Sequence, residues 1–182
     1  MARARLVDAI VPGKTFPDLV FVSRWSRFLF FHDSVMFESE FVSSLQRLLV
    51  AEGSRCARAE CLDSAWSDRA VESFTLHVDT DPAEYEIVLN GTDEVLGWNQ
   101  VIARFGVTSE LAGWAIYCER HSECGVLALH DDLTGPFLDA VGRDWNLEPV
   151  GVAVKNPDME QLSSPNLPDE WRRRLTAAYA NY

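Results

Sequence analysis

Cysteine and histidine side chains cluster in the stretch GWAIYCERHSECGVLALHDD, residues 113–132. Cys118, His121 and Cys124 follow one another at C-x2-H-x2-C spacing, and thiolates and imidazoles are common zinc ligands. A structural zinc site needs four ligands, and here the fourth would have to be His130 or a cysteine distant in the sequence. A catalytic Cys–His pair is also disfavoured, because a reactive thiolate needs positive surroundings and a glutamate adjoins each cysteine. We therefore predict a β-hairpin with a polar turn and no metal.

Two carboxylates follow an apolar run in FTLHVDTDP, at Asp79 and Asp81. A pair of carboxylates at the end of a strand can share a divalent cation, as in many phosphoryl- and glycosyl-transfer sites. The D-x-D pattern is short, however, and the only lysines available to hold a phosphate are Lys14 and Lys155. A metal-dependent transferase that uses Asp79 and Asp81 is therefore an alternative function and not the first choice.

His32, Asp33 and Ser34 supply the residue types of a hydrolase triad. Three adjacent residues are not expected to face one another as a triad does, and the G-x-S-x-G nucleophile turn is absent. The phosphate-binding and dinucleotide-binding glycine motifs and the H-E-x-x-H zinc motif are absent as well. We expect no catalytic residue and no cofactor.

The first half of the chain alternates between strand and helix patterns. LVFVSRWSRFLFF, residues 19–31, is rich in aromatic and β-branched residues and predicts one or two strands. A helix is expected next, with an apolar face and a stop at Gly53, and it starts near Glu38 or Ser39; the face consists of Phe41, Leu45, Leu48 and Leu49. CARAECL and AVESFTLHV, residues 56–62 and 70–78, then predict two further strands.

The second half begins with AEYEIVLNGT, residues 83–92, where Tyr85, Ile87 and Leu89 alternate with other residues. This pattern predicts a strand that forms a hairpin with the preceding one. A helix is expected from Thr92 to Gly106, followed by the 113–132 hairpin and a short helix over 134–145.

The last expected elements are a buried strand over 149–155 and a C-terminal helix that begins near Pro168. Trp171, Leu175 and Tyr179 form the inner stripe of that helix. Strands follow strands too often for regular βαβ units. The prediction is a single α+β domain over residues 1–182, with a mainly antiparallel sheet and three to four helices packed on one face.

The net charge of −12 and the isoelectric point near 4.7 restrict the partners of the chain. Nucleic acids and anionic membranes attract basic surfaces, so neither is expected to bind. No segment resembles an export signal or a membrane span, which predicts a cytoplasmic location with Cys56, Cys61, Cys118 and Cys124 as free thiols.

Acidic residues are concentrated over residues 60–94, where ten acids oppose Arg69 alone and give a local charge of −9. Residues 1–30 carry five basic groups and two acids, a local charge of +3. The acidic region could be a solvated face that maintains solubility. The alternative is a docking surface for a basic protein, and its candidate residues are Asp79, Asp81, Glu84, Glu86, Asp93 and Glu94.

In general character the chain resembles bacterial immunity proteins, which neutralise toxins by binding them. The resemblance lies in FLFFHDSVMFESEF, HVDTDPAEYEIVLNGTDE and the 113–132 hairpin, together with the small size and acidity of the chain. It implies a non-enzymatic protein with a basic toxin or effector as its partner. An adaptor or chaperone for a secreted protein would share these properties and remains an alternative, and the sequence leaves the oligomeric state open.

Overall fold

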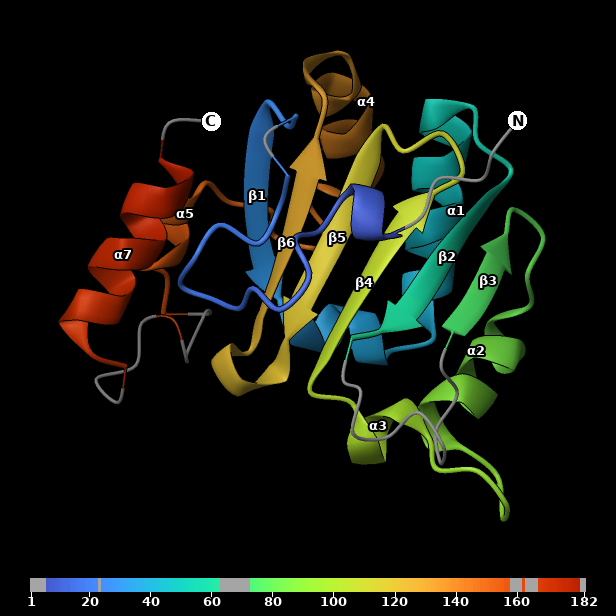
Figure 1. Ribbon diagram of the computed structural model, residues 1–182. Helices are drawn as coiled ribbons and strands as arrows, with labels where there is room; N and C mark the ends of the chain where they lie inside the picture. Colours follow the sequence, from blue (N-terminus) through green and yellow to red (C-terminus); the bar gives the residue numbers. More distant parts are fainter. Residues whose placement is uncertain (1–5, 23, 63–72, 158–161, 163–166, 181–182) are drawn as a thin grey trace.

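A six-stranded antiparallel sheet forms the centre of the structure (Figure 1). The computed structural model describes residues 6–22, 24–62, 73–157, 162 and 167–180. In sheet order the strands are β1 (Arg27–His32), β6 (Cys124–Leu129), β5 (Trp114–Glu119), β4 (Arg104–Ser109), β2 (Cys56–Cys61) and β3 (Ser73–His77). Each neighbouring pair runs antiparallel, so the predicted α+β class with an antiparallel sheet is confirmed.

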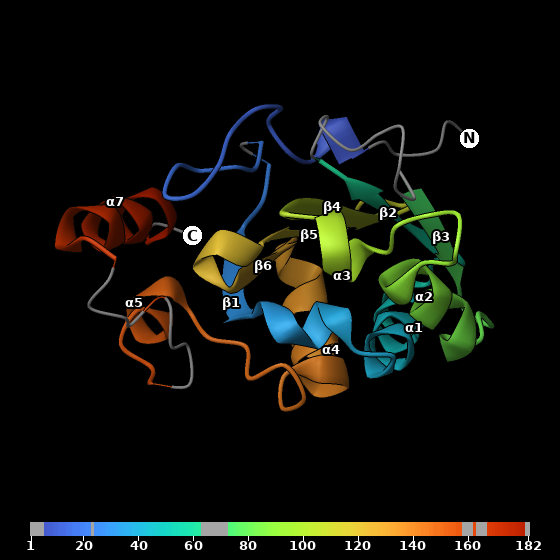
Figure 2. The same ribbon diagram turned by 90° about the horizontal axis from the view of Figure 1, so that it is seen from below.

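Both faces of the sheet are covered (Figure 2). One face packs against α1 (Glu40–Glu52), α2 (Pro82–Asn90), α3 (Trp98–Val101) and α4 (Asp131–Val141). The other face packs against the N-terminal segment, which starts with the 3-10 turn η1 (Leu6–Asp8), and against α5 (Val150–Ala153) and α7 (Asp169–Tyr179). The expectation of helices on a single face was therefore wrong. Two further 3-10 turns are η2 (Asp33–Phe37) and η4 (Arg120–Ser122).

The predicted hairpin over residues 113–132 is confirmed as β5, η4 and β6. Trp114, Ile116 and Cys118 lie in the core on the side of α1, while Ala115 and Tyr117 lie in the core on the opposite side. All six residues of β6 are buried, as expected for a central strand with both faces covered.

The N-terminal and C-terminal parts of the described chain meet over this second face. The Tyr179 hydroxyl donates to the carbonyl of Asp18 and accepts from the amide of Val20, at 3.2 and 3.1 Å. Arg174 pairs with the Asp18 carboxylate at 2.7 Å. The Tyr179 ring also lies edge-on to Phe28 and Phe30, so α7 closes the core that the N-terminal segment begins.

The predicted amphipathic helices α1 and α7 are also confirmed. In α1 the expected stripe is buried, and Gly53 ends the helix in a left-handed conformation with φ of 79°. In α7 Leu175 and Tyr179 are buried and Trp171 is half-buried. Pro168 precedes α7 as its N-cap residue and is not its first helical residue.

The strand predicted over residues 83–92 is instead helix α2. Tyr85, Val88 and Leu89 are its buried residues, at the i, i+3, i+4 spacing of a helix, and Ile87 is exposed. Asp81 accepts a hydrogen bond from the Ala83 amide at 3.0 Å and caps the helix, which Pro82 opens. The short apolar run fits both the two-residue period of a strand and the 3.6-residue period of a helix. The Asp81 cap and Pro82 at the helix start decide in favour of the helix.

The long helix predicted over residues 92–106 was wrong. The Thr92 hydroxyl accepts from the amides of Glu94 and Val95, and a turn follows in place of a helix. Gly91 has φ of 77°, and a Cβ on Gly97 would lie 2.3 Å from backbone atoms of residues 89 and 90. This close approach of the chain to itself leaves only the four-residue α3 before β4 begins.

The buried strand predicted over residues 149–155 is the short helix α5. The backbone of Glu148 bonds to Phe30 of β1 in both directions, at 2.7 and 2.9 Å, and Pro149 then starts the helix. The valine-rich composition favoured a strand, but this pairing with β1 ends after a single residue.

Glu52, the last residue of α1, joins that helix to the turn between β4 and β5. Its Oε1 accepts from the Gly113 amide at 2.7 Å and from the Ser109 hydroxyl at 2.9 Å. Its Oε2 accepts from the Trp114 indole at 3.0 Å and from the Ser54 hydroxyl at 2.5 Å. One half-buried carboxylate thus satisfies four donors.

Glu52→Gln should lower the free energy of unfolding by about 1–3 kcal/mol, although it preserves the shape of the side chain. In either orientation the amide group of glutamine faces the N–H of Gly113 or of Trp114, and that donor loses its acceptor. Urea unfolding measures the change. Glu86→Gln, on the exposed side of α2, is the matched control and should have almost no effect. Equal stabilities of the two variants would show that the Glu52 network does not hold the turn.

Candidate partner-binding surface

All six predicted partner-binding residues are exposed and lie at one end of the molecule, near β3 and α2 (Figure 1). Two precede α2, two lie on α2, and two follow it; in that order they are Asp79, Asp81, Glu84, Glu86, Asp93 and Glu94. We call these six residues the acidic surface. Residues 79–94 contain no lysine or arginine, so no basic side chain within the segment neutralises the surface. Asp63, Asp68, Arg69 and Glu72 lie outside the described residues.

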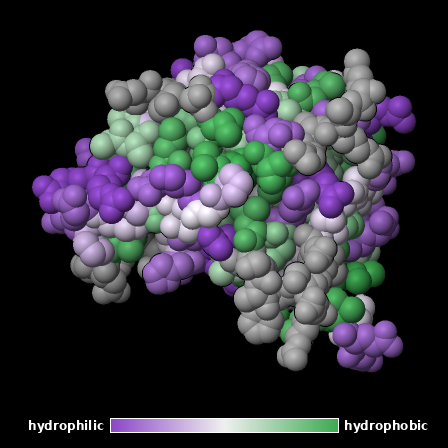
Figure 3. All heavy atoms as spheres, viewed as in Figure 1, coloured by the Kyte–Doolittle hydropathy of each residue, from purple (hydrophilic) through white to green (hydrophobic). Residues whose placement is uncertain are grey.

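Large aliphatic side chains are exposed in this segment and directly beside it. They are Val78, Ile87, Val95 and Leu96. Figure 3 shows apolar and hydrophilic atoms side by side in this part of the molecule, at the lower right. Ile87 is 57% exposed, between the acids of α2 and those of the following turn. A face that serves solubility alone has no need of these aliphatic groups, whereas an interface combines charge with apolar contact.

Asp79 and Asp81 lie at the junction of β3 and α2. The Asp81 carboxylate caps α2, and Asp79 lies in the turn between β3 and the helix. Within the described ranges, no group of three or more histidine, cysteine, aspartate and glutamate side chains is placed to hold a metal ion. Both aspartates are exposed at the surface.

Cys118 and Cys124 lie on opposite faces of the sheet. Cys118 belongs to the core beneath the helices, Cys124 to the core on the second face, and His121 is exposed in η4 between them. The three side chains consequently do not converge on a common centre. Burial raises the pKa of both thiols well above the ordinary value, and the nearby carboxylate of Asp33 adds to the effect.

The buried thiols should be inert in the folded protein. A thiol reagent such as Ellman's reagent should modify the half-buried Cys61 first and reach Cys118 and Cys124 only when the protein unfolds, because burial blocks access and suppresses the thiolate. Elemental analysis of the purified protein should find no bound zinc. About one zinc per chain, lost in the double variant Cys118→Ser/Cys124→Ser, would contradict this arrangement.

His32 and Ser34 are in contact at the end of β1. The Ser34 hydroxyl lies 2.9 Å from Nδ1 of His32, and Glu123 lies 3.6 Å from Nε2. The same Nδ1 also accepts the Ser34 amide at 3.1 Å, so the imidazole caps η2. Asp33 approaches this nitrogen as well, at 3.4 Å, so His32, Asp33 and Ser34 are not arranged as a triad, which places its acid and its nucleophile on opposite nitrogens. The cluster fixes the end of β1.

Asp33 is only 5% exposed, and its burial raises the pKa of the carboxyl group. The charge of Glu123 raises this pKa further, while His32 and Arg120 lower it. The folded state therefore binds the Asp33 proton more tightly than the unfolded state does. As the pH rises from the pKa of Asp33 in the unfolded chain through its pKa in the folded protein, the contribution of this group to the free energy of unfolding is lost.

Asp33→Asn should consequently gain stability relative to wild type as the pH increases. At about pH 3 both proteins carry a neutral side chain at this position, whereas at about pH 7 only wild type must bury a charge. Urea unfolding of both proteins across this range measures the difference. A difference that stays constant with pH would show that Asp33 titrates alike in the folded and unfolded chains.

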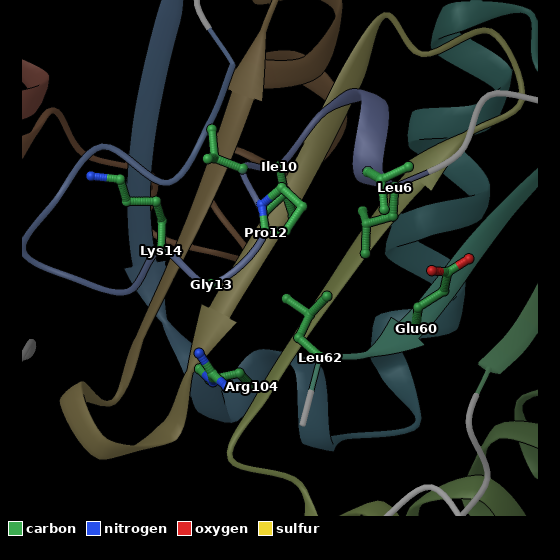
Figure 4. A pocket seen from close by; sticks show the side chains of 10 residues that line it. Leu6, Ile10, Pro12, Gly13, Lys14, Glu60, Leu62 and Arg104 are labelled. Carbon is green, nitrogen blue, oxygen red and sulfur yellow. The ribbon is translucent and has the colours of Figure 1, made fainter. Parts of the chain in front are cut away.

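A cavity of about 330 Å³ lies between residues 6–14 and strands β2 and β4 (Figure 4). Leu6, Ile10 and Leu62 form part of its apolar wall. Its polar neighbours already have partners, since Lys14 lies 3.5 Å from Asp18 and Glu60 lies 2.6 Å from Arg58. No sequence pattern indicated this cavity, because the N-terminal segment forms it by folding back over the sheet.

No protein-family model, curated protein or solved structure matches the chain. None of the helices in the described part of the chain is long and apolar enough to cross a membrane.

Proposed function

We propose that the protein is a non-enzymatic binding protein whose acidic surface docks a basic protein partner. The observation that supports this proposal is the joint exposure of six acids and four aliphatic side chains within residues 78–96. The acids attract a basic partner over a distance, and the aliphatic groups offer contact area once it has arrived. The partner that best fits the acidity and general character of the chain is a bacterial toxin or effector, which the protein neutralises by covering its basic site.

The charges and the aliphatic groups should control different steps of binding. Steering by charge acts on the association rate and is screened by salt, with a Debye length of about 8 Å at physiological ionic strength. Apolar contacts form only in the bound complex, so their loss appears in the dissociation rate. This separation allows each half of the surface to be tested independently.

Glu84→Lys/Glu86→Lys should slow association about tenfold at low salt and flatten the salt dependence of the rate. Both residues are exposed on α2, so the fold should survive the change. Asp132→Lys/Asp139→Lys makes the same change in net charge on exposed positions of α4 and is the matched control. The ligand is the product of a neighbouring gene that co-purifies with the protein, and stopped-flow or surface-based kinetics measure the rates. If both double variants slow association equally, only the net charge matters and the acidic surface is not the docking site.

Ile87→Ala supplies the second arm of this test. It should raise the dissociation rate and leave the salt dependence of association unchanged, because it removes apolar contact without altering charge. Val152→Ala on α5 is the control, since Val152 is 51% exposed against 57% for Ile87 and lies at the other end of the molecule. An unchanged dissociation rate for Ile87→Ala would remove the aliphatic groups from the interface.

A further inference from the structure

Strand β3 is an edge of the sheet, and part of its backbone faces outward (Figure 1). The Val78 amide donates to the Arg55 carbonyl at 3.2 Å, and this bond shows which residues of β3 direct their backbone groups toward β2. In an antiparallel pair the bonding direction alternates, so Leu76 and Phe74 also bond to β2 while Thr75 directs its N–H and C=O away from it. Among the described residues, these outward groups of Thr75 have no hydrogen-bond partner.

Two other outward pairing positions on the sheet edges are already occupied. At the opposite edge, Phe30 of β1 exchanges two backbone hydrogen bonds with Glu148. On β3 itself, the outward amide of His77 donates to the Thr80 hydroxyl at 2.7 Å, and the His77 carbonyl accepts from the Thr80 amide. The open part of the β3 edge is thereby confined to Ser73–Thr75.

The open edge lacks the usual protection against pairing with another chain. Edge strands are commonly guarded by lysine or proline, and β3, with the sequence SFTLH, contains neither. The exposed acids Asp79 and Asp81 lie just beyond the strand, and Arg58 of β2, which contacts the Ser73 hydroxyl, is already paired with Glu60 at 2.6 Å. A second copy of this chain would bring the same acids to the edge and be repelled, whereas a basic segment would be attracted.

We propose that the basic partner adds an extended segment to the edge of β3. Backbone hydrogen bonds to Thr75 and Ser73 would hold this segment, and its lysine or arginine side chains would face Asp79 and Asp81. The inference rests on the proposed function and deepens it, because it states the conformation in which the partner binds.

Thr75→Pro tests the role of the backbone. Proline removes the outward N–H and is tolerated in edge strands when the lost donor faces solvent, so the circular dichroism spectrum and melting temperature should stay close to wild type. Thr75→Ala keeps the N–H and controls for loss of the side chain. The probe is a synthetic peptide of about eight residues that alternates lysine with valine, and an otherwise identical peptide with glutamate in place of lysine is its control. Fluorescence anisotropy measures binding.

The lysine peptide should bind wild type and Thr75→Ala alike, bind Thr75→Pro at least about tenfold more weakly, and be preferred over the glutamate peptide. Hydrogen exchange at the Thr75 amide of wild type should slow when the lysine peptide is added, a readout that needs no variant. Unchanged exchange, absence of peptide binding, or full binding to a folded Thr75→Pro would overturn the proposal. Sedimentation showing a wild-type dimer that Thr75→Pro abolishes would assign the edge to a second copy and overturn it too.

Failure of strand addition can be distinguished from failure of the proposed function. If Glu84→Lys/Glu86→Lys weakens binding of the natural partner and Thr75→Pro does not, the acidic surface docks the partner without strand addition. If neither variant affects that binding, the proposed docking site itself is wrong.

Discussion

The burial of β5 and β6 on both faces is the constraint on which the rest of the fold depends. Strands with water on one side can alternate apolar and polar residues, but every residue of β6 is buried. Two separate layers must therefore cover the sheet. The helices α1 to α4 form one layer, while the second is shared between the N-terminal segment, α5 and α7.

This constraint explains why the end of the molecule at β3 is the more exposed one. The central strands β5 and β6 are almost completely buried, whereas β3 at the edge has half-buried residues at Ser73, Phe74 and Thr75. The turn and helix that follow it carry charge that could not be buried, because an unpaired carboxylate in the core is costly. The acids are concentrated where the fold demands the least burial, and a basic partner could reach them there.

The sequence predicted those elements for which periodicity and end signals agree. α1 combines an i, i+3, i+4 stripe with Gly53 at its end, and the long apolar run of β6 fits only a strand covered on both sides. α2 was missed because Tyr85, Ile87 and Leu89 also fit a period of two. Asp81 followed by Pro82 was the available sign of a helix start.

Tertiary contacts determined the elements that no local pattern could reveal. The close approach of Gly91 and Gly97 shortens α3, and the pairing of Glu148 with Phe30 sets the start of α5. The exposure of the acidic surface was nevertheless predictable, since a run of acids without basic residues stays in water whether its backbone is helical or extended. Neither the exposed aliphatic groups nor the open edge of β3 could be inferred, because both depend on which residues the fold leaves uncovered.

The closure of the second face by α7 has a consequence for biosynthesis. The ribosome makes the N-terminal segment first and α7 last among the described elements, so Phe28 and Phe30 lack the ring of Tyr179 throughout most of translation. During that interval the nascent chain displays an uncovered aromatic surface, which favours aggregation. The contacts between Asp18 and α7 can form only once α7 has left the exit tunnel, so the second face of the sheet is the last part of the described fold to close.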